Sequence, residues 1–243
     1  MTTYASNTAL YADSHLKEGV DWARRFRRHE RFDDSLSRTG EVPKTVILAP
    51  HGGGIERGTS ELCLAVAGYH PATLPEVPAA GVTYDYWMFE GVRDDDNAPL
   101  HVPSIGCDDG MAVSLCAGAL NALSLHGFKP QDPPDDKVVL VGGGNELLRR
   151  FLLEGFEPTD IKAVDAGSTG DDELDGNDPR NIVNRTLLGM GGAQLELSEP
   201  LRETMFTTNT RPRRKHTTTG VFWTLVAVCR DALDRLEAGQ VVF

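Results

Sequence analysis

The stretch Thr45-Val-Ile-Leu-Ala-Pro-His-Gly-Gly-Gly-Ile-Glu-Arg-Gly58 is the segment that indicates the fold. Its first five residues are apolar and rich in β-branched types, which is typical of a buried strand. The strand is expected to end at Pro50, where a glycine-rich loop begins. Thr59 is a residue type that caps helices, and a helix is predicted from there through Ala67. Strand, glycine loop and helix in this order are typical of α/β proteins, whose functional residues gather at the carboxyl ends of strands.

The rest of the chain continues the alternation of strands and helices. Further strands are predicted over residues 82–90, 100–103, 137–141, 160–165 and 192–198, and helices over residues 13–31, 111–125, 145–154 and 221–236. Residues 167–180 are rich in Gly, Asp and Asn, as surface loops are. The pattern predicts one doubly wound α/β domain over residues 41–243, with a mixed, mainly parallel sheet flanked by helices. A helical, charged segment over residues 1–40 is expected to precede it.

Composition and charge exclude several classes of protein. The formal net charge is -12, so the chain has no broad electrostatic reason to bind nucleic acid, and an anionic ligand would need a local basic pocket. The four cysteines form no CxxC pair, which favours reduced thiols over a disulfide framework. We recognise neither a signal peptide nor an apolar run of membrane-spanning length. These features predict a cytoplasmic protein, and a monomer is the simplest expectation.

The glycine loop carries two residue types that bind metals. His51 begins the loop and Glu56 follows five residues later, and both imidazole and carboxylate are good Zn²⁺ ligands. The loop lacks the GxxxxGK[ST] pattern of a phosphate-binding loop. The spacing is a weak signal by itself, because a polar loop can use the same residues for its own stability. A catalytic zinc ion needs a third protein ligand. The candidates are His101, at the end of a short apolar segment, and Cys107, His70 and His126.

Two further residues have both a structural and a functional interpretation. Glu196 lies between Leu195 and Leu197 in an alternating segment, and a carboxylate there either faces solvent or serves as a general base. The pattern alone favours solvent. His126 precedes Gly127 at the end of the helix predicted over residues 111–125, where it would complement the helix dipole.

The string from Ala49 to Glu61 closely resembles the signature of the poly-γ-glutamate hydrolase family, phage and bacterial enzymes that are often labelled phage-related replication proteins. The matching segments that follow, in the family's order, are Phe89-Glu-Gly91, Leu100-His-Val-Pro-Ser104, Leu125-His-Gly127, Asn181-Ile-Val-Asn-Arg185 and Gln194-Leu-Glu-Leu-Ser198 with Arg202. Because six such motifs occur in the family's order and span roughly residues 45–230, the chain is identified as a member of the family.

The resemblance implies a zinc-carboxypeptidase-like fold and a zinc site formed by His51, Glu56 and His101. It assigns Glu196 as the general base for hydrolysis of γ-glutamyl amide bonds, with zinc activating the attacking water. It also raises His126 from a helix cap to a candidate site residue.

The resemblance also implies how a substrate carboxylate is held. Asn184-Arg185 is similar to the Asn-Arg pair with which zinc carboxypeptidases bind a carboxylate. Poly-γ-glutamate carries one α-carboxylate per residue, so Arg202 and part of the basic run Arg211–Lys215 would complete a local basic patch. A solvated loop is the alternative for that run.

Some positions depart from the family pattern and keep other functions open. After His101 a second histidine and a phenylalanine are usual in the family, whereas this chain has Gly106-Cys107. The acidic stretch at residues 171–178 also departs from the family pattern. One alternative is a zinc hydrolase of a small γ-glutamyl or acyl-amino-acid compound. Another is a phage protein associated with nucleic acid, which the acidic charge disfavours. A nucleotide site at Gly142–Gly144 lacks the GxGxxG spacing. A phage-encoded enzyme would be released on host lysis.

Overall fold

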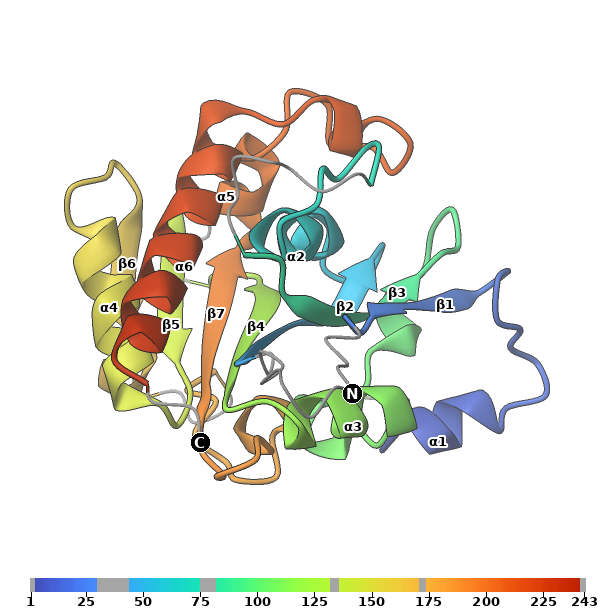
Figure 1. Ribbon diagram of the computed structural model, residues 1–243. Helices are drawn as coiled ribbons and strands as arrows, with labels where there is room; N and C mark the ends of the chain where they lie inside the picture. The colour runs from blue at the N-terminus through green and yellow to red at the C-terminus, as the bar shows by residue number, and fades with distance from the viewer. Residues whose placement is uncertain (1–2, 30–43, 75–81, 132–135, 171–173, 241–243) are drawn as a thin grey trace.

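A seven-stranded mixed sheet forms the centre of the computed structural model, which describes residues 3–29, 44–74, 82–131, 136–170 and 174–240 (Figure 1). Its strands lie in the order β1-β3-β2-β4-β7-β5-β6. The central strands β3, β2, β4 and β7 are parallel, β1 is antiparallel to β3, and β5 and β6 run together antiparallel to β7. The strands are β1 (Trp22–Arg27), β2 (Thr45–Gly53), β3 (Asp85–Gly91), β4 (Asn121–Phe128), β5 (Val138–Gly142), β6 (Lys162–Asp165) and β7 (Gly192–Ser198). The predicted single α/β domain with a mixed, mainly parallel sheet is confirmed.

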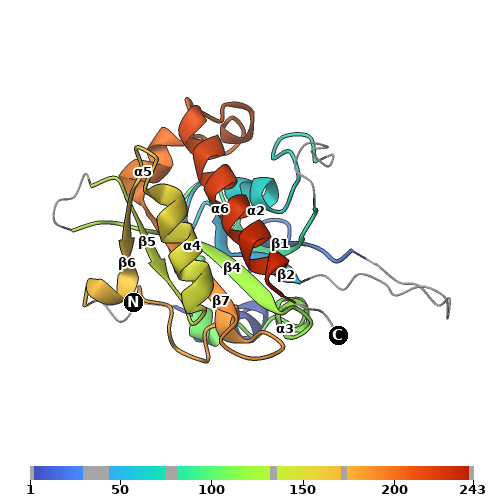
Figure 2. The same ribbon diagram turned by 60° about the vertical axis from the view of Figure 1, so that its left-hand side comes forward.

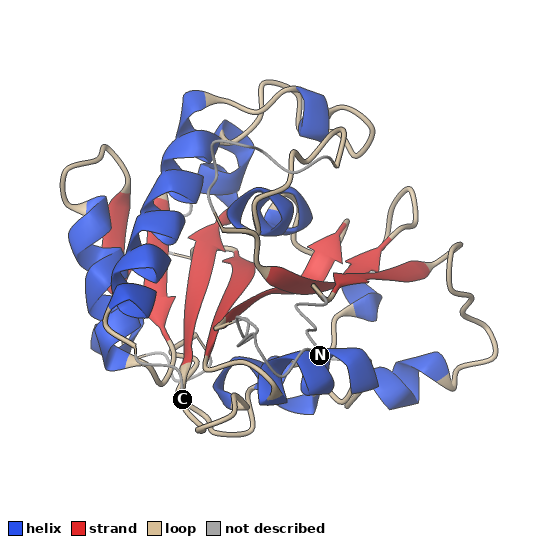
Figure 3. Cartoon of the chain, in the orientation of Figure 1, coloured by secondary structure: helices blue, strands red, loops and turns tan. Residues whose placement is uncertain are grey.

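Helices cover both faces of this sheet (Figures 2 and 3). The helices α2 (Thr59–Val66), α4 (Glu146–Phe156) and α6 (Gly220–Ala238) pack on one face, while α1 (Asn7–Tyr11) and α3 (Gly110–Ala117) cover the other. Successive β2 residues point to opposite layers, Ile47 to the first and Val46 and Leu48 to the second. Because both faces are buried, β2 is a continuous apolar run. The shorter elements are α5 (Glu199–Thr204) and the 3₁₀ turns η2 (Ala98–Leu100), η3 (Ser104–Gly106), η4 (Ala166–Ser168), η5 (Ile182–Asn184) and η6 (Arg214–His216).

The turn from the glycine loop into α2 depends on a glycine. Gly58, rather than the expected Thr59, is the N-cap residue, and it has φ +100°. A Cβ at this position would also come within 2.9 Å of the Phe206 ring. Only glycine adopts this conformation at little cost, so Gly58 sets where the helix begins.

The helix predicted over residues 111–125 is wrong in its second half. Helix α3 ends at Ala117, and the chain turns at Gly118 before β4 begins at Asn121. An apolar run that is buried on all sides has no clear period, so it fits a helix and a central strand equally well. The correction moves His126 from a helix end to a strand.

The helix predicted over residues 13–31 is also wrong. Trp22–Arg27 forms β1, an edge strand paired with β3, and its outward arginines suit an exposed edge. The short strand expected over residues 100–103 is absent, since η2 ends at Leu100 and an extended loop follows. The domain boundary near residue 40 lies outside the described residues and stays a prediction.

The remaining predicted elements are present within a few residues of their expected bounds: β3, β5, β6, β7, α4 and α6. In the described part of the chain, no helix has both the length and the apolar character needed to cross a bilayer.

Candidate metal centre

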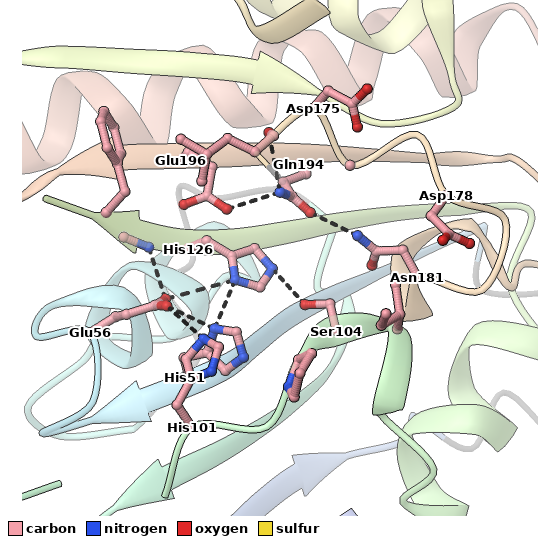
Figure 4. Close-up of a pocket in the computed structure, with 16 residues that line it drawn as sticks. His51, Glu56, His101, Ser104, His126, Asp175, Asp178, Asn181, Gln194 and Glu196 are labelled. Carbon is pink, nitrogen blue, oxygen red and sulfur yellow. Dashed lines mark hydrogen bonds and ion pairs between the residues drawn. The ribbon is translucent and has the colours of Figure 1, made fainter. Parts of the chain in front are cut away.

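The parallel strands β2, β4 and β7 deliver the candidate site residues to one edge of the sheet. His51 lies near the end of β2, His126 near the end of β4 and Glu196 near the end of β7. The β4–β7 register pairs His126 directly with Glu196, so both side chains leave the same face of the sheet. Figure 4 shows His51, His101 and His126 gathered around Glu56, with Glu196 on the neighbouring strand.

His51, on β2, and Glu56, in the turn that follows β2, form a buried pair. His51 Nδ1 lies 2.7 Å from Glu56 Oε1, and His51 Nε2 donates to the Val102 carbonyl at 2.7 Å. Glu56 Oε2 accepts a 2.8 Å hydrogen bond from the backbone N–H of Gly127. Burial lowers the pKa of His51, but the charge and hydrogen bond of Glu56 outweigh burial, so the pKa is raised.

His126 faces this pair from β4. Its Nδ1 lies 3.1 Å from His51 Nδ1 and 3.7 Å from Glu56 Oε2, while its Nε2 lies 2.6 Å from Ser124 Oγ. Burial, together with the neighbouring His51, lowers the pKa of His126 well below its ordinary value. The ring is therefore neutral, and a neutral imidazole is the form that binds a metal.

His101 also contacts this pair and is more exposed. Its ring is tilted by 35° against the His51 ring at a centroid distance of 3.9 Å, and its Nε2 lies 3.8 Å from Glu56 Oε1. Burial and the charge of His51 lower the pKa of His101 to about 3. Its side chain is 39% exposed, against 4% for His51 and 2% for His126. His101 is thus a neutral imidazole at the mouth of the cluster rather than at its centre.

Glu196 is oriented by a chain of amide hydrogen bonds. Asn181 Nδ2 donates to Gln194 Oε1 at 3.0 Å, and Gln194 Nε2 donates to Glu196 Oε1 at 2.9 Å. Gln194 pairs in register with Ser124, so the pair Ser124–Gln194 lies one step below the pair His126–Glu196 on the same face. The sequence interpretation missed Ser124 and gave Gln194 no role. The period of two along both strands is the signal that marks them.

The donor atoms fit a zinc ion. His51, Glu56 and His126 each offer one ligand atom, and these atoms lie within 4.8 Å of one another. Two imidazoles and a carboxylate are a donor set typical of catalytic zinc. Nε2 of His51 lies 2.7 Å from the Val102 carbonyl oxygen and Nε2 of His126 lies 2.6 Å from Ser124 Oγ, and such outer contacts orient metal-binding histidines.

Apart from His126, the residues expected to bind substrate make hydrogen bonds to the backbone. Asn184 is buried, and its side chain accepts a hydrogen bond from the backbone N–H of Gly144 and donates to the carbonyls of Gly176 and Asp178. Arg185 donates to the Cys107 carbonyl. Arg202 lies beneath Gly127 and donates to the carbonyls of Leu197 and Arg57. Their roles in substrate binding stay predictions.

The alternative metal ligands are also away from the centre. Cys107 is buried in the core cluster beneath α3, where burial raises its pKa to about 12. His70 follows the end of α2 and accepts from the backbone N–H of Ala72.

A cavity of about 520 Å³ opens over the cluster. Its lining includes the three histidines and four carboxylates, contributed by Glu56, Asp175, Asp178 and Glu196. Among the described residues that line it there is neither lysine nor arginine. A bound cation would offset part of this negative charge.

Comparison with known proteins adds an independent line of evidence. Residues 25–228 match the poly-γ-glutamate hydrolase family. Over 189 residues the chain is 32% identical to the SPbeta prophage-derived UPF0714 protein YoqZ of Bacillus subtilis (strain 168), a match that covers 76% of this chain and 60% of YoqZ. Over 192 residues it is 29% identical to the UPF0714 protein YmaC of the same organism, covering 79% of this chain and 73% of YmaC.

Solved structures agree with the sequence matches. A bacteriophage poly-γ-glutamate hydrolase superimposes with a TM-score of 0.79 at 28% identity, covering 99% of this chain and all of the other. The zinc-free apo form of YndL has a TM-score of 0.76 at 23% identity, with 97% and 99% coverage, and shows the shared fold. The family match spans all of the strands that carry the candidate metal centre.

Proposed function

The chain belongs to the poly-γ-glutamate hydrolase family, and we propose that it is a zinc-dependent hydrolase of γ-glutamyl amide bonds in poly-γ-glutamate. The observation that carries the proposal is the convergence of His51, Glu56 and His126 beside the Glu196 carboxylate. A metal-binding cluster with a carboxylate next to it is the arrangement that metal-assisted amide hydrolysis requires.

His51, Glu56 and His126 would hold the zinc ion, with His101 as the alternative third imidazole. Zinc bound there would supply a Lewis acid for the scissile carbonyl and lower the pKa of water toward ~7. His126 is favoured over His101 because Ser124 fixes its ring with Nδ1 toward the other two residues. We find no comparable orienting contact for His101 in the described part of the structure.

Glu196 would act as the general base. It would take a proton from the attacking water and deliver it to the leaving amine, and a positioned carboxylate of this kind contributes about 10²–10⁴-fold to rate. Gln194 holds Glu196 Oε1, and Asn181 holds Gln194 in turn. The carboxylate is thereby oriented before substrate arrives, so little reorganisation is needed during the reaction.

A second function is favoured by the charge of the cavity. Four carboxylates around the cluster oppose a densely anionic polymer and would suit a small γ-glutamyl compound with few negative charges. Incubation of the purified protein with poly-γ-glutamate and, separately, with a γ-glutamyl dipeptide tells the two apart. Shortening of the polymer that a chelator abolishes supports the first function. Cleavage of the dipeptide alone supports the second.

The metal ligands are tested by zinc analysis of single variants. We expect about one zinc per chain in the wild type and in His101→Ala, and loss of zinc in His51→Ala and His126→Ala. The reverse result for His101 and His126 would assign His101 as the third ligand. Full zinc in all three variants would refute this cluster as the metal centre.

A further inference from the structure

A second cavity, of about 820 Å³, is lined in part by Gly53, two residues after His51. The loop contributes to both cavities, with His51 and Glu56 lining the metal cavity and Gly53 lining the second one. Segments far apart in the sequence meet here: Glu61 from α2, Glu90 from β3, and the basic run at residues 211–215. These residues therefore gather in a cavity of their own, and the candidate metal centre uses none of them.

The charges of the two cavities differ in sign. The second cavity is lined by three carboxylates, from Glu61, Glu90 and Asp94, and by four cations, from Arg25, Arg211, Arg214 and Lys215. In a chain of net charge -12 this is a local excess of positive charge, whereas the metal cavity is lined by four carboxylates without a lysine or arginine in its described lining. The cations that an anionic polymer needs are therefore gathered in the second cavity.

The floor of the second cavity holds a polar pair that is incompletely satisfied. The Arg214 side chain is only 2% exposed, and its Nε lies 3.7 Å from Glu61 Oε1. Arg214 Nη1 donates to the Gly53 carbonyl at 3.1 Å. Arg214 Nε and Glu61 Oε2 are buried without a hydrogen-bond partner. A buried donor without a partner is costly, so Arg214 is poised to gain from an added acceptor.

The rim carries cations that are weakly engaged by carboxylates. Arg25 lies 3.5 Å from Glu90, a long ion pair. Arg211 donates to the carbonyl of Val92. In the described part of the structure, no ion pair to a carboxylate involves Arg211 or Lys215. Both side chains can thus turn to an anion that enters from solvent.

We propose that this second cavity is an exosite that binds α-carboxylates of poly-γ-glutamate at a distance from the scissile bond. Arg211 and Lys215 would capture carboxylates at the rim, and Arg214 would supply a buried donor below them. The inference rests on the proposed function for its choice of polymer. It explains how an acidic protein whose metal cavity is itself negative can hold a polyanion.

The test compares two double variants that lose the same charge. The double variant Arg211→Ala, Lys215→Ala removes two cations from the rim of the exosite. Arg150→Ala with Lys162→Ala removes two exposed cations from α4 and β6, at the far edge of the sheet from β1. Fluorescence anisotropy with labelled poly-γ-glutamate, on full-length proteins that also carry Glu196→Gln to prevent cleavage, gives the dissociation constants. In the active proteins, the ratio of kcat/KM for the polymer to kcat/KM for a γ-glutamyl dipeptide is measured.

We expect the rim variant to bind polymer roughly 5–10-fold more weakly, the loss of two partly exposed charge contacts. Its polymer-to-dipeptide ratio should fall by a similar factor, while the matched control stays within about twofold of wild type in both measurements. Equal weakening in the two double variants would mean that only the overall charge matters, and would overturn the proposal, as would unchanged binding in both. If the wild type cleaves neither substrate but the rim variant alone loses polymer binding, the proposed function fails and the exosite stands.

Discussion

Replacement of Ser124 by alanine should weaken zinc binding without removing a zinc ligand. Ser124 Oγ lies 2.6 Å from His126 Nε2 and fixes the ring so that Nδ1 points to His51 and Glu56. The other hydroxyl nearby, Ser104 Oγ, is 3.5 Å away, too far to replace it well. His126 is buried, so the variant leaves its ring N–H without a good partner.

The magnitude follows from the role of the contact. Loss of an outer partner of a metal-binding histidine typically costs 10–100-fold in metal affinity, about 1.4–2.8 kcal/mol. The buried N–H left behind should also lower the free energy of unfolding by about 1–3 kcal/mol. A metal-binding role predicts both losses, whereas a purely structural role predicts the second alone.

Competition with a fluorescent zinc chelator at fixed pH measures the affinity, and urea unfolding measures the stability. Thr45→Val is the matched control, because it also removes a buried hydroxyl with side-chain hydrogen bonds, at the opposite end of the sheet. Thr45→Val should lose stability and keep the zinc affinity of the wild type. If Ser124→Ala keeps wild-type zinc affinity while it loses stability, His126 is not a ligand that Ser124 orients, and the reasoning is refuted.

Three further predictions follow from other parts of the structure. Glu196→Gln should retain zinc and lose at least ~100-fold in turnover, and near-normal turnover would remove it from the mechanism. Gly127→Ala would place a Cβ 2.4 Å from Nε of the buried Arg202 and should cost about 1–3 kcal/mol in urea unfolding, whereas Gly110→Ala, with open space around it, should cost little. Burial raises the pKa of Cys229 to about 12, against ~8.5 in an unfolded chain. The unfolded state therefore releases this proton first, and the free energy of unfolding should fall as pH rises above about 8, while the native thiol resists alkylation at pH 8 until the protein unfolds.

Local signals in the sequence are sufficient to predict a helix or strand whose ends are marked by glycine, proline or capping residues. The β2 strand and α2 are predictable because an apolar run, three glycines and a capping position follow one another within a few residues. The strand nevertheless continues to Gly53, past its expected end at Pro50. The late strand β7 was placed at its observed bounds, since polar and apolar residues alternate there. The residue types that bind metal, His51 and Glu56, were found in the same way.

Local signals failed where burial removes the pattern or where pairing is distant. The stretch from Gly110 to Phe128 is mostly apolar, and only a short turn at residues 118–120 separates the helix from the strand. The arginine run of the edge strand β1 suits an exposed helix face as well as an exposed strand edge, so the sequence alone predicts a helix there. The pairing of β1 with β3, about 60 to 70 residues away, decides between the two.

The sequence by itself determined the family, the succession of most elements and the chemical types in the site, because these depend on neighbouring residues and on recognisable motifs. The tertiary structure alone decided which side chains meet. His126 faces Glu196 because β4 and β7 are hydrogen-bonded neighbours, and Ser124 and Gln194 support them because side chains on one face of a sheet recur every second residue. Residues 70 positions apart acquire a common site only when the sheet forms, since strand order and register are set by the burial of both faces of the whole sheet rather than by any single segment.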